Sequence, residues 1–126
     1  MKKVIYTKDA PEPIGPYSQG ILIDKILFVS GQIAINPVTG NLMLDNVHEE
    51  AAQIMRNIGA ILKAAGMDYS NIVKTTIFLT NMNNFSSVNE VYGSFFKDSF
   101  PARETVQAAR LPKDVNIEIS VTASAE

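Results

Sequence analysis

A stripe of apolar side chains between residues 51 and 65 is the feature that most constrains the fold of this chain. The stripe repeats every three or four residues, which is the spacing that places side chains on one face of an α-helix. Asn46 is placed to cap the start of this helix, with Glu49 three residues later as in a capping box, and Gly66 is placed to end it. The members of the stripe are Ala51, Ile54, Met55, Ile58, Ile61, Leu62 and Ala65.

Short β-rich runs lie on both sides of this helix. Two of them are separated only by Asp24 and Lys25, which predicts a hairpin. A second helix is expected from about Asn84, with an apolar stripe from Phe85 to Phe96, and it has to end before Pro101. The strands are predicted at residues 3–7, 20–23, 26–35, 71–81, around 103–107 and 115–123.

The predicted order of elements is β-β-β-α-β-α-β-β. Two strand–helix–strand crossovers of this length normally connect parallel neighbouring strands in a right-handed sense, which puts both helices on the same face of one sheet. The sequence therefore predicts an α/β fold (a two-layer α+β sandwich), with a mixed sheet of about six strands and two helices on one face. A chain of 126 residues has room for one such domain, residues 1–126.

Two helices leave the second face of such a sheet without cover. In the last strand the odd-numbered residues from Val115 to Val121 are apolar and are assigned to the helix side, whereas the even-numbered residues from Asn116 to Thr122 are polar and face the other way. A broad face that mixes polar and apolar groups seldom stays bare. We therefore expect it to pack against another subunit.

Composition argues against several classes of function. The net charge is −2 and the basic residues are scattered, so the electrostatic footprint of a nucleic-acid binder is missing. The chain has no cysteine, which fits a cytoplasmic location, and no apolar run approaches the length of a membrane span. No set of His, Asp and Glu residues has metal-ligand spacing, and His48 is expected to be solvated.

The stretch "FPARETVQAARLP" contains the first candidate for chemistry. On a strand, Arg103 and Thr105 point one way and Glu104 points the other, so Glu104 is poorly placed to neutralise Arg103. We expect Arg103 to be aimed at the uncovered face, where its guanidinium can hold a carboxylate in a bidentate way. The alternative is that Arg103 pairs with a carboxylate across a subunit interface.

Glu118 is the second candidate, because it lies between two isoleucines on a strand, where glutamate is disfavoured. If it is partly buried on the uncovered face, its pKa rises into the range of a general acid or base. The alternative is a solvated residue at the edge of the sheet.

Three further positions have two interpretations each. Tyr17 follows Gly15 and Pro16, so it is either a hydroxyl donor or aromatic wall of a site, or it packs on the hairpin. The glycine in Ser30–Gln32 lets a backbone approach a ligand closely, or it marks a bulge. Asn89 in the second helix either faces outward or covers the edge of the sheet.

Several motifs together resemble one known family. "IGPYSQG", "FVSGQIAINPVTG", "IVKTTIFLTNMNNFSSVNEVYGSFF" and "FPAR…ARLPKDVNIEI" are similar to the Rid (reactive intermediate deaminase, YjgF-like) family, in particular its RidA branch, over essentially the whole chain. The resemblance implies a chorismate-mutase-like fold and a homotrimer with a central barrel and three sites at the subunit clefts. It also implies hydrolysis of 2-imino acids, such as 2-iminobutanoate and 2-iminopropanoate, to 2-keto acids and ammonia without a cofactor.

The resemblance also implies roles for individual residues. Arg103 matches the family's carboxylate-binding arginine and Glu118 its catalytic glutamate, while the backbone carbonyl of Thr105 would accept a hydrogen bond from the imine nitrogen. The other matches to substrate-binding positions are Tyr17, Ser30, Gly31 and Asn89.

Two positions depart from the family pattern. Many relatives have cysteine at the position of Thr105, which matters little for a contact made by the backbone. Many have a small or apolar residue at the position of Glu104, whose charge would compete with a substrate carboxylate if the strand twisted it towards Arg103.

Two other functions stay open at this point. The same cleft in a non-enzymatic regulatory or chaperone-like module would bind small carboxylates without turnover. An endoribonuclease is also an activity attributed to some relatives, but the scattered basic residues do not favour it.

Overall fold

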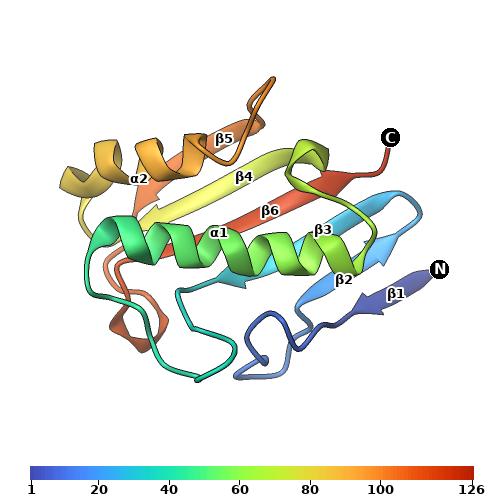
Figure 1. Ribbon diagram of the computed structural model, residues 1–126, viewed down its shortest axis with the longest axis horizontal. Coiled ribbons are helices and arrows are strands. Elements are labelled where there is room, and N and C mark those ends of the chain that lie inside the picture. The colour runs from blue at the N-terminus through green and yellow to red at the C-terminus, as the bar shows by residue number, and fades with distance from the viewer.

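The computed structural model describes all 126 residues, as a six-stranded sheet with two helices on one of its faces (Figure 1). The predicted α+β architecture and the order of the elements are confirmed. Short 3₁₀ turns lie at Tyr69–Asn71, Met82–Asn84 and Pro112–Asp114. The strands and helices are β1 (Lys2–Ile5), β2 (Gly20–Ile23), β3 (Ile26–Gln32), α1 (Val47–Ala64), β4 (Ile72–Leu79), α2 (Phe85–Gly93), β5 (Ala102–Gln107) and β6 (Ile117–Ser124).

The strand order in the sheet is β1-β2-β3-β6-β4-β5, which corrects one expectation. The crossover through α2 joins the parallel neighbours β4 and β5, as predicted. The crossover through α1 joins β3 and β4, which are parallel but not adjacent, because β6 lies between them and is antiparallel to both. A strand with one wholly apolar face buries that face best in the middle of the sheet, and β6 has one.

Both helices follow local signals in the sequence. The Asn46 side chain accepts a hydrogen bond from the Glu49 N–H at 2.9 Å and so caps α1, but the reciprocal bond of a full capping box does not form. Gly66, with a φ of 77°, follows the end of α1 in the left-handed conformation that glycine adopts without strain. The helix α2 ends at Gly93, so Phe96 lies beyond it and packs against the core from the following loop.

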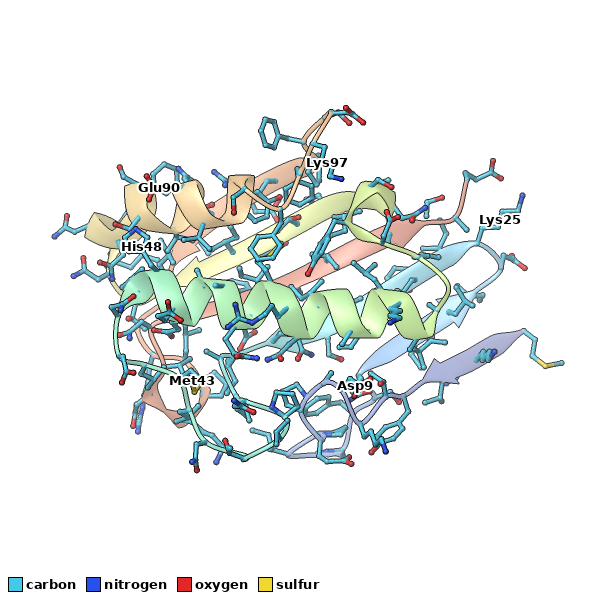
Figure 2. The ribbon with its side chains drawn as sticks, viewed as in Figure 1. Asp9, Lys25, Met43, His48, Glu90 and Lys97 are labelled. Carbon is cyan, nitrogen blue, oxygen red and sulfur yellow. The ribbon has the colours of Figure 1, made fainter.

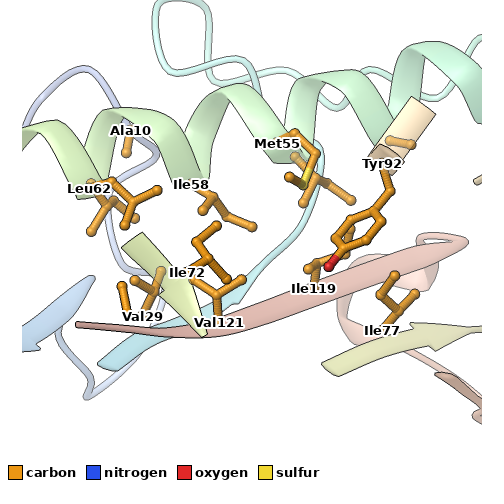
Figure 3. Close-up of a cluster of buried hydrophobic side chains, with 14 of the residues drawn as sticks. Ala10, Val29, Met55, Ile58, Leu62, Ile72, Ile77, Tyr92, Ile119 and Val121 are labelled. Carbon is orange, nitrogen blue, oxygen red and sulfur yellow. The ribbon is translucent and has the colours of Figure 1, made fainter. Parts of the chain in front are cut away.

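The core lies between the helices and the sheet. Figure 3 shows Met55, Ile58 and Leu62 of α1 above Ile119 and Val121 of β6. The odd-numbered side chains of β6 thus face the helices, as predicted, and the even-numbered ones face away. Neither helix combines the length and the apolar character that crossing a membrane requires.

A buried carboxylate connects the two layers. Glu50, in the first turn of α1, is fully buried, and its carboxylate accepts hydrogen bonds from the Asn116 N–H at 2.9 Å, the Asn116 Nδ2 at 2.8 Å and the Ile117 N–H at 3.1 Å. A buried charge is tolerated only when such donors replace water. The start of β6 is therefore fixed against the start of α1 by a group that the apolar pattern of the helix did not reveal.

We predict that Glu50→Gln lowers the free energy of unfolding by about 1–3 kcal/mol, because an amide NH₂ would face donors that now bond to a carboxylate oxygen. Chemical denaturation at a fixed protein concentration measures the change. Glu49→Gln, on the exposed side of the same turn, is the matched control and should change stability little. Equal stability of the two variants would contradict the role given to Glu50.

Candidate active site

Arg103 lies on the helix-covered face of the sheet, so the expectation that it is aimed at the uncovered face is wrong. In the parallel register of β4 and β5, Arg103 pairs with Thr75, whose side chain is fully buried under the helices. The sequence showed which residues of β5 share a face, but not which face it was. That choice follows from how β5 pairs with β4.

Three side chains of α2 contact the Arg103 guanidinium. Its Nη1 donates a hydrogen bond to Asn89 Oδ1 at 2.7 Å, and its Cζ lies 5.6 Å from the centre of the Phe85 ring and 5.3 Å from that of Tyr92. These three residues are spaced i, i+4 and i+7, so they lie along one side of the helix. Arg103 has no carboxylate partner within the chain, which leaves its charge available for an anion.

Glu104 faces away from Arg103, as predicted. Its carboxylate accepts a hydrogen bond from the Thr76 hydroxyl and forms an ion pair with Lys74 Nζ at 3.0 Å. The hydrogen bonds from Thr76 and Lys74 lower the pKa of Glu104. The carboxylate is thus held by partners on the opposite face from Arg103, so the two neighbours do not form a charge pair.

Glu118 lies on the uncovered face, as expected, and lines a cavity of about 320 Å³. Burial raises the pKa of its carboxyl above the ordinary value, and no ion pair opposes this effect. A carboxyl group with a raised pKa exchanges protons more readily near neutral pH. The same cavity is lined by three predicted site residues, Tyr17, Ser30 and Gly31, and by the adjacent Gln32.

The Glu118 carboxylate occupies the space that a side chain at position 31 would fill. A Cβ atom at Gly31 would lie 2.4 Å from Glu118 Oε2, a distance at which the carboxylate has to move. The pairing of β3 with β6 also shifts register between Val29 and Gln32, so the bulge interpretation of this glycine is confirmed. The absent side chain and the bulge together make room for the Glu118 carboxylate.

The loop that holds Tyr17 is fixed by a residue that the sequence did not single out. Tyr17 is 45% exposed, and its hydroxyl oxygen accepts a hydrogen bond from the Ile14 N–H at 3.2 Å. The side-chain amide of the buried Gln19 accepts a hydrogen bond from the Thr7 N–H at 2.8 Å through Oε1. Its Nε2 donates to the Thr7 carbonyl at 2.9 Å and to the Pro11 carbonyl at 2.9 Å. No periodic pattern marks such a residue, because its partners belong to a loop.

The predicted site residues fall into two groups within one chain. Arg103 and Asn89 line one cavity, together with Tyr92, whereas Glu118 lines another, and no residue lines both. The strand β4 separates the strands of Arg103 and Glu118, and the two side chains lie on opposite faces. Ideal sheet spacing puts their Cα atoms roughly 14 Å apart, too far for one small molecule to bridge.

Thr105, an expected site residue, and His48, expected to be solvated, line neither cavity. Thr105 lies on the same face as Arg103 but lines neither cavity, and its Oγ1 is buried without a hydrogen-bond partner. His48 is exposed, as predicted, and its Nε2 lies 3.1 Å from Glu90 Oε1, where α1 passes α2 (Figure 2). No three His, Asp or Glu side chains form a group that could hold a metal ion.

The chain is similar to known proteins both in sequence and in fold. The model of the endoribonuclease L-PSP family matches residues 7–125. A curated human protein named 2-iminobutanoate/2-iminopropanoate deaminase is 50% identical over 98% of this chain and 90% of its own length. Two solved structures are similar over nearly their whole length. A Rid-family protein from Yersinia pestis has a TM-score of 0.96, 50% identity and coverage of 99% and 100% of the two chains. Escherichia coli TdcF with bound serine has a TM-score of 0.95, 42% identity and coverage of 98% and 99%.

We predict that Gly31→Ala lowers the pKa of Glu118 towards the ordinary carboxyl value, because the new methyl group pushes the carboxylate out of its sheltered position. A ¹³C NMR titration of the glutamate carboxyl groups measures this pKa. Gly15→Ala is the matched control, since its added Cβ would lie at an ordinary 3.6 Å from the Tyr17 ring. An unchanged Glu118 pKa in a folded Gly31→Ala variant would contradict the account of this glycine.

Proposed function

Because the chain belongs to the endoribonuclease L-PSP (YjgF/Rid) family, we propose that it hydrolyses reactive 2-imino acids, such as 2-iminobutanoate and 2-iminopropanoate, to 2-keto acids and ammonia. The observation that carries this function is the 50% identity to the human deaminase over 98% of the chain. An arginine without a carboxylate partner and a carboxyl group with a raised pKa are two groups that suit such a reaction.

We further propose that the two groups of site residues meet between neighbouring subunits of a homotrimer with a chorismate-mutase-like fold and a central barrel. The separation of Arg103 and Glu118 within one chain supports a shared site. The uncovered face also supports assembly, because it exposes large apolar side chains: Val4 is 57% exposed, Phe28 50% and Val106 43%. Each chain, residues 1–126, then acts as a single domain, and we propose a cytoplasmic location.

In this arrangement Arg103 binds the substrate carboxylate. Asn89 accepts one of its N–H groups, which leaves the outer part of the guanidinium fork free for a bidentate bond. Asn89 thus acts mainly by orienting Arg103. Tyr17, Ser30 and Gly31 of the neighbouring subunit line the opposite wall beside Glu118, and the backbone carbonyl of Thr105 accepts a hydrogen bond from the imine nitrogen.

Glu118 performs the proton transfers. Its carboxylate takes a proton from a water molecule as the water oxygen attacks the C=N carbon, and the proton passes to nitrogen. Glu118 then takes the proton of the new hydroxyl group and passes it to the nitrogen as the carbon–nitrogen bond breaks and the C=O bond forms, so one imine and one water give one keto acid and one ammonia. General acid–base steps of this kind each contribute about 10²–10⁴-fold in rate. No step in this scheme uses a cofactor.

A mixing experiment tests both the reaction and the shared site. Arg103→Ala and Glu118→Gln should each be inactive in ammonia release from a 2-imino acid generated by a dehydratase. After equal amounts of the two variants are denatured together and refolded, about 25% of wild-type activity should return, because about three quarters of random trimers are mixed and each mixed trimer has one complete site of three.

The controls separate the two proposals. Wild-type protein taken through the same refolding sets the reference, and each variant refolded alone should stay inactive. An active wild type with an inactive mixture would overturn the shared site but not the reaction. A wild type that does not speed ammonia release would overturn the reaction. RNA cleavage by that inactive protein would instead support the endoribonuclease named in the family's description.

A further inference from the structure

Tyr92 is the more deeply buried of the two aromatic residues that contact Arg103. Its side chain is 4% exposed, whereas Phe85, on the other side of the guanidinium, is 37% exposed. The Tyr92 hydroxyl donates a hydrogen bond to Thr75 Oγ1 at 2.9 Å, and both groups are buried. Its ring also contacts Phe96, with the ring centres 4.9 Å apart. The ring is thus held at its hydroxyl end and along its side.

Thr75 connects this hydroxyl bond to the arginine itself. Thr75 lies directly opposite Arg103 in the β4–β5 pairing, so the strand that positions the arginine backbone is next to the residue that binds Tyr92. Burial raises the pKa of Tyr92, which keeps its hydroxyl protonated and able to donate. The aromatic face of Tyr92 therefore stands at a fixed position relative to the Arg103 backbone.

The fixed Tyr92 ring restricts the rotamers of the long Arg103 side chain. An arginine on an edge strand has many rotamers, and a carboxylate that binds it has to select one of them at an entropic cost. A cation–π contact with a rigid ring and a hydrogen bond to Asn89 restrict those rotamers before the ligand arrives. The Tyr92 hydroxyl is buried and bonded to Thr75, so its effect on a ligand has to pass through the ring and Arg103.

We propose that Tyr92 and Thr75 are positioning residues, which hold the Arg103 guanidinium in the orientation that binds the substrate carboxylate. This inference rests on the proposed function for the identity of the ligand. It adds to that function a pair of buried hydroxyl groups that set the affinity for the carboxylate without touching it.

Loss of the hydroxyl bond should weaken carboxylate binding more than catalysis. Tyr92→Phe and Thr75→Val should each raise KM about 3- to 10-fold, the range expected for one side chain that is no longer pre-ordered, with kcat changed less than about 2-fold. The dissociation constant of 2-oxobutanoate, measured by calorimetry, should rise by the same factor. It should not change when Tyr92→Phe is added to Arg103→Ala, because the buried Tyr92 hydroxyl acts only through the position of Arg103.

The double variant Tyr92→Phe with Thr75→Val separates positioning from mere stability. Each single variant leaves one buried hydroxyl without a partner and lowers stability, whereas the double variant removes both hydroxyl groups and should regain most of it. Its KM should nevertheless stay raised, because the ring is no longer tied to β4. A double variant that regains the wild-type KM together with its stability would overturn the proposal.

Tyr69→Phe is the matched control. The Tyr69 hydroxyl also donates a hydrogen bond in the helix layer, to the Met55 carbonyl at 2.7 Å, but it has no contact with Arg103. This variant should lose stability and keep its KM. Unchanged KM and 2-oxobutanoate affinity in both Tyr92→Phe and Thr75→Val would refute the positioning role. Raised dissociation constants in a protein without deaminase activity would refute the proposed reaction but not the positioning of Arg103.

Discussion

The hydrogen bonds that the Glu50 carboxylate accepts from Asn116 and Ile117 are the constraint on which the rest of this structure depends. They join the first turn of α1 to the start of β6, which is a central strand of the sheet. Once Ile117 faces the helices, strand alternation directs every second residue of β6 into the core and Glu118 out of it. The Glu50 carboxylate thus ties the two layers together at the start of β6, and the alternating pattern of β6 directs Glu118 away from the helices.

The same alternation divides the candidate site. On β6 it directs Glu118 away from the helices, and on β5 it directs Arg103 towards them. β5 is an edge strand, and Phe85, Asn89 and Tyr92 of α2 contact the guanidinium there. In the proposed reaction neither half can do the chemistry alone, since Arg103 binds the carboxylate and Glu118 transfers the proton. The proposed function therefore makes assembly of subunits a condition of activity.

The features that could be predicted from the sequence are those set by local spacing. The Asn46 cap, the hairpin at Asp24 and the outward direction of Glu118 follow from periodicity within one segment. The face of Arg103 and the place of β6 between β3 and β4 depend on pairing between distant strands, which periodicity does not report. The buried polar residues were also missed, because Gln19 and Glu50 are buried by their particular partners and not by an apolar pattern.

Glu104 and Glu118 both lie on the uncovered face, but their surroundings shift their pKa values in opposite directions. Glu104 has the Lys74 ammonium and the Thr76 hydroxyl beside it, which lower its pKa and keep it ionised. Glu118 has neither kind of partner, and burial raises its pKa. Environments that push two carboxyl pKa values apart separate a charged structural group from one that can exchange a proton. The departure from the family pattern at position 104 is therefore compatible with the proposed reaction, because the charge of Glu104 is balanced by Lys74 and directed away from Arg103.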